Sequence, residues 1–359
     1  GSYAPVPPNI KSTEVYSWNL GVQRQFTPNW FASANYIGNH AIHMWTLVEL
    51  NPAIYFPGTA NSSGQCFVQG YTLTTTPGAV CSTTGNTNQR RRLNLSNPVA
   101  AQNISYLTQF DDGATQFYHG LLLNTTVRAT RNVNLNSNYT WSHCIGDATV
   151  GAVVANPGGN YPHMDNRRLD RGNCTGDRRH LLNFTVVAQT PQFANSMLRR
   201  LATGWSLSGI YRYSTGQPLS ILSGLDQALN GVVVGNPQRV NQVLPNVFAP
   251  DRGSACANAA PCLTYLNLAA FSQPAAGTLG NMGVLNVAGP GFWQFDAALT
   301  RTFLIAERQK VEMRAEAFNV LNGVRLNNPA VVLSNPITFG RILSAQDPRI
   351  MQFAVKYAF

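Results

Sequence analysis

Charged residues are scarce in this sequence. They make up 11% of its 359 residues, whereas soluble proteins contain ~25%. Asn, Thr, Ser, Gln and Gly take their place. A surface of this kind is expected where one half of each strand faces hydrocarbon and the other half faces a hydrated lumen.

Three other absences exclude further classes of protein. No stretch approaches the ~18 consecutive apolar residues of a membrane-spanning helix. Residues 1–8 lack the basic segment and apolar run of a signal peptide, so we expect the sequence to begin after processing or to be a fragment. No GxSxG elbow, P-loop or HExxH motif occurs, and we expect neither enzymatic activity nor a cofactor.

The net charge of +10 suggests a nucleic-acid partner, but the arrangement of the arginines argues against one. They form short clusters at 90–92 and 167–171, in stretches that look like loops, without a recognition helix or zinc-finger spacing. Loop arginines that face anionic outer-leaflet lipid or an anionic ligand explain the charge equally well. We therefore expect outer-membrane lipid or lipopolysaccharide, and no nucleic acid, as a partner.

The last segment, 349–359, alternates with the period of two that a strand requires. One face is wholly apolar or aromatic and the other is mostly small or polar. The apolar set is Met351, Phe353, Val355, Tyr357 and Phe359. Such a strand fits a barrel whose apolar face meets lipid, or the edge of a soluble sandwich.

The same alternation recurs along the chain and predicts about nine long strands. They lie near 16–23, 30–36, 117–128, 133–141, 180–186, 205–213, 295–303, 311–317 and 349–359. Some links between them are short, at 27–29, 131–132 and 306–308, and others are long and polar, at about 47–113, 145–177, 221–290 and 323–345. Short periplasmic turns and long extracellular loops are typical of an outer-membrane barrel. A soluble sandwich explains the strands but not this asymmetry, so we expect an all-β, transmembrane antiparallel β-barrel.

Glu312, Arg314 and Glu316 occupy alternate positions of one expected strand. They would face the lumen of a barrel or form the wet face of a sandwich, and this strand alone does not separate the two. Nine strands is an odd number, whereas bacterial single-chain barrels are even-numbered. Either the count is wrong by one, or the sequence is the C-terminal part of a larger barrel.

Several short motifs follow one another in a fixed order. They are Y-T-W-S-H at 139–143, D-R-R-H at 177–180, G-W at 204–205, T-G-Q-P at 215–218, G-P-G-F at 289–292, R-A-E-A-F-N at 314–319, F-G-R-I at 339–342 and D-P-R at 347–349. The set resembles TonB-dependent outer-membrane receptors of the Oar-like type. The end of the chain is similar to the signal read by the barrel-assembly machinery, with Gln352 at the polar position and Tyr357 and Phe359 at the aromatic ones. Ala354 stands where that signal usually has Gly.

The resemblance implies a 22-stranded barrel with an N-terminal plug and a segment that engages the inner-membrane protein TonB. Neither is present here, so 1–359 would be a single barrel region that supplies the C-terminal strands. The implied function is that of a receptor or transporter in the outer membrane of a Gram-negative bacterium, which captures an unknown ligand at the cell surface. The alternative is a structural or adhesive barrel without transport, which would lack the plug.

All six cysteines lie in or beside the expected outside loops. Pairing within each loop would join Cys66 to Cys81, Cys144 to Cys174 and Cys256 to Cys262. Six cysteines allow 15 pairings, and an oxidising exterior suits disulfides. Free thiols and metal ligands are the alternatives, although no pair has CxxC spacing. Such disulfides are not part of the family pattern.

Two other groups of polar residues could be sites. His40 and His43 could bind a metal with a third ligand, but a strand-end pair that faces solvent is the preferred interpretation, and we expect no metal site. Asp165, Asp170 and Asp177 lie near the arginines at 167–171. A salt-bridged loop explains them better than a catalytic cluster.

Overall fold

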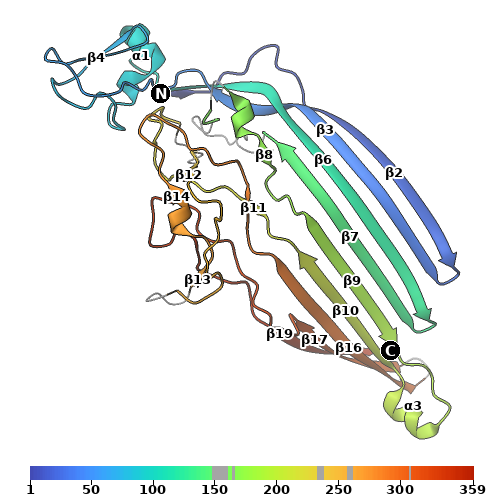
Figure 1. Ribbon diagram of the computed structural model, residues 1–359. Helices are drawn as coiled ribbons and strands as arrows, with labels where there is room; N and C mark the ends of the chain where they lie inside the picture. The colour runs from blue at the N-terminus through green and yellow to red at the C-terminus, as the bar shows by residue number, and fades with distance from the viewer. Residues whose placement is uncertain (148–160, 164–165, 233–237, 257–261, 307–308) are drawn as a thin grey trace.

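One large antiparallel sheet dominates the computed structural model, which describes residues 1–147, 161–163, 166–232, 238–256, 262–306 and 309–359. Strands that follow one another in the chain also pair with one another (Figure 1). In sheet order they are β2 (Glu14–Thr27), β3 (Trp30–Glu49), β6 (Tyr106–Thr130), β7 (Val133–Gly146), β9 (His180–Gln189), β10 (Trp205–Ser214), β16 (Phe292–Ala306), β17 (Gln309–Phe318) and β19 (Ile350–Ala358). Within these residues, the expected all-β class and nine long strands are confirmed.

Two short strands add to this sheet, and its two edges are open. β1 (Ser2–Tyr3) pairs with β6 in parallel, and β8 (Gly172–Asn173) pairs with β7. β2 and β19 are the outermost strands, and neither pairs with a further strand of the described chain on its outer side. Each edge therefore presents a row of unpaired backbone groups.

The register places the apolar side chains of neighbouring strands on one face of the sheet, which we call the apolar face. Leu121 of β6 lies opposite Tyr36 of β3 and Trp141 of β7. Leu299 of β16 lies opposite Leu207 of β10. Because a slip of one residue would turn every side chain to the other side, the apolar face is continuous only in this register.

The other face of the sheet is polar and carries the contacts with the loops. Asn124 of β6 lies opposite Ser33 of β3 and Asn138 of β7. Near one end of the sheet, the Arg178 guanidinium donates to the Ser214 hydroxyl at 2.9 Å. One polar face and one apolar face, which alternate along the regular parts of the strands, are the pattern of a membrane β-barrel wall.

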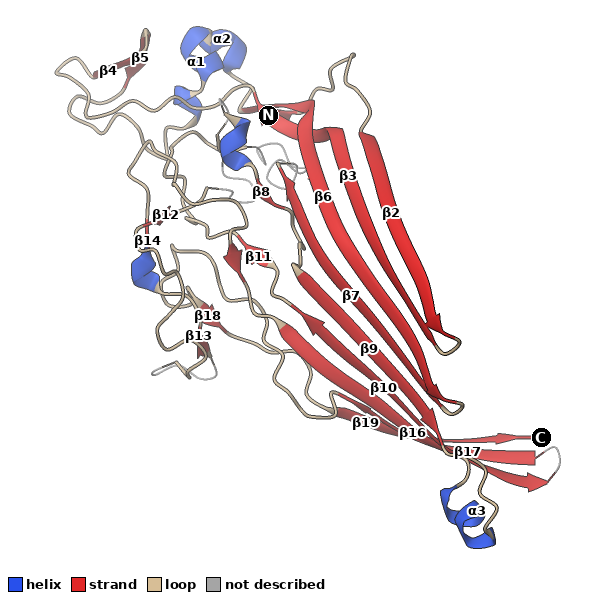
Figure 2. Ribbon diagram, turned by 45° about the vertical axis from the view of Figure 1, so that its right-hand side comes forward, coloured by secondary structure: helices blue, strands red, loops and turns tan. Residues whose placement is uncertain are grey.

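Short and long connections lie at opposite ends of the sheet. Figure 2 shows the tight β2–β3 and β6–β7 turns at the lower end, together with α3 (Ser196–Ala202) in the β9–β10 connection. The connections after β3, β7, β10 and β17 gather at the other end (Figure 1). We call these the short-turn end and the long-loop end. Among the described residues, no helix is long and apolar enough to cross a membrane.

The first long loop is shorter than expected, because β3 continues through Glu49 and β6 begins at Tyr106. The sequence placed this loop at 47–113. The pairing of β3 with β6 shifts in register between Ala41 and Met44 and again before Thr46. These irregularities interrupt the alternation of apolar and polar side chains. The alternation in the sequence therefore does not predict the outer ends of β3 and β6 as strands.

The long connections contain short elements of their own. Pairs of short strands are β4 (Gln65–Val68) with β5 (Tyr71–Thr74), β11 (Pro218–Leu219) with β15 (Val287–Ala288), β12 (Asn241–Gln242) with β14 (Phe271–Ser272), and β13 (Leu263–Thr264) with β18 (Arg341–Ile342). The helices are α1 (Arg92–Ser96) and α2 (Pro98–Ala101), with 3-10 turns η1 (Asn88–Arg90), η2 (Arg167–Asp170) and η3 (Leu268–Ala270). Since β13 and β18 belong to different connections, their pairing joins the loops after β10 and β17.

Two apolar cores lie in these loops. From the sequence, the loops were expected to be polar. One is shared by the loops after β10 and β17 and includes Ile221, Val240, Phe271 and Phe339, all at most 6% exposed. The other lies in the loop after β3 and includes Phe56, at 1% exposed. Burial of apolar side chains stabilises the loops at about 25 cal/mol per Å² of buried surface. The long-loop end is therefore folded structure rather than a set of extended loops.

Candidate functional site

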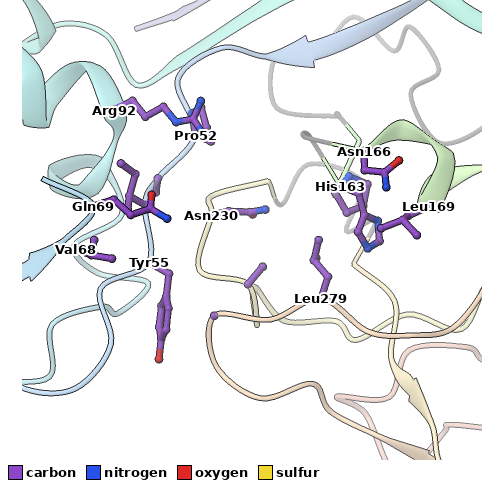
Figure 3. Close-up of a pocket in the computed structure, with 15 residues that line it drawn as sticks. Pro52, Tyr55, Val68, Gln69, Arg92, His163, Asn166, Leu169, Asn230 and Leu279 are labelled. Carbon is purple, nitrogen blue, oxygen red and sulfur yellow. The ribbon is translucent and has the colours of Figure 1, made fainter. Parts of the chain in front are cut away.

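A pocket of about 470 Å³ lies among the loops at the long-loop end (Figure 3). Three separate connections form it. The loop after β3 contributes Tyr55, Gln69 and Arg92, the loop after β7 contributes His163, and the loop after β10 contributes Asn230. A site built from three connections depends on the tertiary fold, and a concave pocket with a few convergent polar groups is a typical ligand site.

The charge of the pocket favours an anionic or neutral polar ligand. Among the described residues that line it, Arg92 is the arginine and His163 the histidine, and there is no carboxylate. Figure 3 shows these two side chains on opposite sides of the pocket, with Asn230 between them. Arg92 is exposed and begins α1. Its guanidinium could pair with a phosphate or carboxylate in bidentate geometry.

Asp170 fixes His163 at the edge of the pocket. The Nδ1 atom of His163 lies 2.7 Å from Oδ1 of Asp170, and its backbone N–H donates to Oδ2 at 2.9 Å. Asp170 is fully buried, and Nη2 of Arg239 lies 2.9 Å from its Oδ1. Burial acts to raise the pKa of Asp170, but the hydrogen bond from His163 and the charge of Arg239 outweigh it and hold that pKa below its usual value.

Arg239 ties two of the pocket-forming loops together. Its Nη2 also donates to the carbonyl of Leu169 at 2.9 Å, and its Nε donates to the carbonyl of Met282 at 2.7 Å. Leu169 belongs to the loop after β7 and Met282 to the loop after β10. The Asp170–Arg239 pair is thus a buried connection whose loss would leave an uncompensated charge.

Arg90 and Arg91 support the opposite wall and do not face a ligand. Arg90 is fully buried, and its Nη1 donates to the carbonyls of Ile54 and Leu229, each at 2.7 Å. Arg91 is 1% exposed, and its Nη1 lies 3.7 Å from Oε1 of Glu49. Burial lowers the pKa of Arg90 from its ordinary value. The expectation that this cluster faces lipid or an anionic ligand is wrong for these two arginines, because buried carbonyls need their N–H groups.

The acidic residues expected in a salt-bridged loop have partners outside their own cluster. Asp177 lies 3.1 Å from Nδ1 of His143 in β7, and Arg167 pairs with Asp111 of β6. Asp165 lies outside the described residues. These contacts connect the loop after β7 to the sheet.

Three disulfides join the cysteines within their own loop regions. Cα–Cα separations are 6.0 Å for Cys66–Cys81, 5.3 Å for Cys144–Cys174 and 5.5 Å for Cys256–Cys262. The first lies in the apolar core of the loop after β3. The second attaches the loop after β7 to the end of that strand. The two therefore hold two of the loops that form the pocket.

The three alternating charges of β17 lie on the polar face of the sheet. Glu312 lies directly opposite Lys356 of β19, and Arg314 forms an ion pair with Glu316. Gln352 of β19 donates to Glu316. These residues lie in the sheet, outside the set of residues that line the pocket.

The residues that resemble a barrel-assembly signal occupy both faces of the last strand. Gln352 is on the polar face, whereas Tyr357 is opposite Val311 on the apolar face. The rings of Tyr357 and Phe359 have centroids 5.8 Å apart, and Phe359 is 92% exposed. Recognition by the barrel-assembly machinery stays a prediction.

His40 and His43 lie within β3, which continues to Glu49, so the expectation of a pair at the end of the strand is wrong. The His40 ring stacks on Phe117 with centroids 3.7 Å apart, and Nδ1 of His43 lies 4.0 Å from a carboxylate oxygen of Asp112. No group of three or more His, Cys, Asp or Glu side chains in the described chain could hold a metal ion.

A sheet with one continuous apolar face, a polar face and loops at one end defines a transmembrane β-barrel wall. The chain belongs to the outer membrane beta barrel domain family, whose model matches residues 1–352. This places the protein in the outer membrane. No curated protein matches the chain.

Three solved structures are similar in fold, at low identity. The outer membrane transporter YddB from Escherichia coli is 10% identical, with a TM-score of 0.46, and the match covers 100% of this chain and 34% of that one. The ferripyoverdine receptor of Pseudomonas aeruginosa is 11% identical, with a TM-score of 0.41 and coverage of 97% and 27%. The FrpB iron transporter from Neisseria meningitidis is 10% identical, with a TM-score of 0.42 and coverage of 99% and 33%. The chain spans about a third of the length of these proteins.

Proposed function

We propose that residues 1–359 are the C-terminal barrel region of a TonB-dependent receptor of the Oar-like type, which captures a ligand with its outside loops. The observation that carries the proposal is the pocket at the long-loop end, which three separate connections enclose. Its position suits a ligand that arrives from outside the cell, since the long loops of such barrels are extracellular. The ordered motifs of the sequence supply the resemblance to this receptor type.

The open edges of the sheet support a larger barrel. β2 and β19 each leave one row of backbone groups unpaired within the described chain. In hydrocarbon every such group must be satisfied, so the barrel has to close. In a 22-stranded barrel, further strands of the complete protein would pair with both edges and enclose a lumen wide enough for a plug.

The pocket favours a polar ligand that carries a carboxylate or phosphate. Arg92 supplies a positive charge and the Gln69 amide supplies hydrogen-bonding groups, whereas the Asn230 Oδ1 already accepts from the backbone N–H of Val232 and from Gln238. The buried connection between Asp170 and Arg239 holds the wall near His163 in place. Fixed walls lower the entropic cost of binding.

The remaining parts of the chain serve assembly and passage. Gln352, Tyr357 and Phe359 would be read by the barrel-assembly machinery. Glu312, Arg314 and Glu316 would face the lumen and contact the plug. TonB would engage a segment of the complete protein outside residues 1–359, and the chain itself would carry out no chemical reaction.

Photo-cross-linking of the full-length protein to TonB in living cells tests this function. We expect a TonB adduct that depends on the TonB-engaging segment, together with surface exposure of the long loops. A protein that reaches the cell surface in normal amounts but never cross-links to TonB would contradict transport. That result would favour the structural or adhesive barrel.

A further inference from the structure

A second hollow, of about 620 Å³, lies on the apolar face near the short-turn end. Its lining comes from β2, β3, β6 and β7. Arg24, Ala32, Thr125 and Ser137 are directly opposed across these strands and form one row. Three of these four side chains are small, so the wall of the barrel is depressed along the row.

Larger side chains enclose the hollow on two sides. Towards the turns, Phe26 stacks on Trp30 with ring centroids 4.5 Å apart. Towards the loops, Leu123 lies opposite Tyr139 in the next row. Trp30 is fixed by a hydrogen bond from its Nε1 to the Thr125 hydroxyl at 3.0 Å. The hollow is therefore an apolar depression with positioned aromatic walls.

Arg24 gives the hollow a positive charge at one side. Among the described residues that line it, there is no carboxylate. The guanidinium carbon of Arg24 lies 5.4 Å from the centroid of the Phe26 ring, on the side of the short turns. A long basic side chain at this depth extends its charged group towards the membrane interface.

We propose that this hollow binds one glycerophospholipid of the periplasmic leaflet, with an acyl chain in the depression and the phosphate on Arg24. Charge complementarity selects an anionic headgroup, and the apolar lining selects the chain. The position selects the leaflet, because short turns lie on the periplasmic side of outer-membrane barrels. The site requires the outer-membrane barrel alone and does not depend on transport.

Native mass spectrometry of the full-length protein tests the site. The protein is delipidated in mild detergent and titrated with phosphatidylglycerol or with diacylglycerol of the same chains. We expect one tightly bound phosphatidylglycerol and much weaker retention of diacylglycerol. Arg24→Gln should weaken phosphatidylglycerol binding roughly fivefold, the equivalent of about 1 kcal/mol for one basic residue near a lipid headgroup. Ala34→Trp, which fills the hollow, should abolish binding of the one tight lipid.

Matched variants separate this site from general contact with lipid. Arg301 also lies on the apolar face, with its guanidinium 4.9 Å from the Trp205 ring, and Ala297 is a small residue of the same face. Arg301→Gln and Ala297→Trp should leave the tight lipid in place. Equal losses in these controls, equal retention of both lipids, or preferential retention of lipopolysaccharide would overturn the proposal. Because Arg24 is exposed, we expect Arg24→Gln to fold normally. This variant therefore still tests the proposal if Ala34→Trp fails to fold.

Discussion

Gln352 of the last strand and Glu316 of the strand before it lie directly opposite each other, and the Gln352 amide donates to the Glu316 carboxylate. This contact places both side chains on the polar face. Phe353, the next residue, must then point to the apolar face, where it is 75% exposed. The alternation of the terminal strand is thus in phase with the alternation of the charges in β17.

A charge on the apolar face should destabilise the barrel much more than a charge on the polar face. Phe184 of β9 lies opposite Tyr211 on the apolar face, whereas Thr185 lies opposite Asn136 on the polar face. Phe184→Arg should lower the free energy of unfolding in lipid vesicles by about 2–4 kcal/mol. Thr185→Arg is the matched control and should change it little. Equal losses in denaturant unfolding would show that this face does not meet lipid.

Removal of the Cys144–Cys174 disulfide should loosen the loop after β7. The two cysteines are separated by 30 residues, and closing a loop of this length is worth about 3–4 kcal/mol in the chain-entropy model. The double variant Cys144→Ser, Cys174→Ser should make this loop sensitive to protease in intact cells. Cys256 and Cys262 are separated by only 6 residues, so their double Ser variant should have a smaller effect on thermal unfolding. If the two double variants lowered the thermal unfolding temperature equally, loop-closure entropy would not explain the stabilisation by these disulfides.

Acid should open the wall of the pocket at Asp170. Since the pKa of this buried carboxyl is lowered in the folded protein, its ionised form stabilises the fold above the usual pKa of ~3.9. That contribution is lost as the pH falls through the lower, folded-state pKa. Proteolysis of the loop after β7 should therefore rise below about pH 4. Asp170→Asn should increase proteolysis of this loop already at neutral pH. The substitution should lower the free energy of unfolding by about 3–5 kcal/mol, because Arg239 remains buried without its partner. A variant with wild-type protection would contradict this role.

Arg92 should decide the charge preference of the pocket. Glucose 6-phosphate and glucose are suitable probes, because they differ only in the phosphate. We expect calorimetry to show binding of glucose 6-phosphate and no measurable binding of glucose. Arg92→Gln should weaken it by roughly tenfold or more, since a hydrogen bond to a charged group contributes about 1.5–3 kcal/mol. Arg199 lies in α3 at the short-turn end, and Arg199→Gln should leave binding unchanged.

The sheet was predictable from the sequence, and most of the pocket was not. Strands such as β7 and β19 have uninterrupted alternation, which reports directly which face meets lipid. The outer end of β3 was missed because register shifts beyond Ala41 break the period. In the sequence, Arg90 and Arg91 look like exposed loop arginines. Only the folded loop shows that both are buried and donate to the backbone carbonyls of Ile54 and Asn51.

The Asp170–Arg239 pair leaves no recognisable pattern in the sequence, because the two residues lie in different loops. A site formed by three connections depends on how their apolar cores pack, and side-chain spacing in one segment carries no information about that. Arg92 lines the pocket and belongs to the arginine cluster at 90–92 that the sequence pointed to, but the sequence does not distinguish it from its two buried neighbours.

Spin labels along β6 test the central claim most directly, that one face of this sheet meets lipid and the other does not. Single cysteines are labelled in turn from residue 116 to 124, and collisions with oxygen and with a water-soluble nickel chelate are measured in lipid vesicles. We expect oxygen contact to peak at Phe117, Leu121 and Leu123, and nickel contact to peak at Gln116 and Asn124. Equal exposure of all positions to nickel, with no period of two, would contradict a membrane barrel.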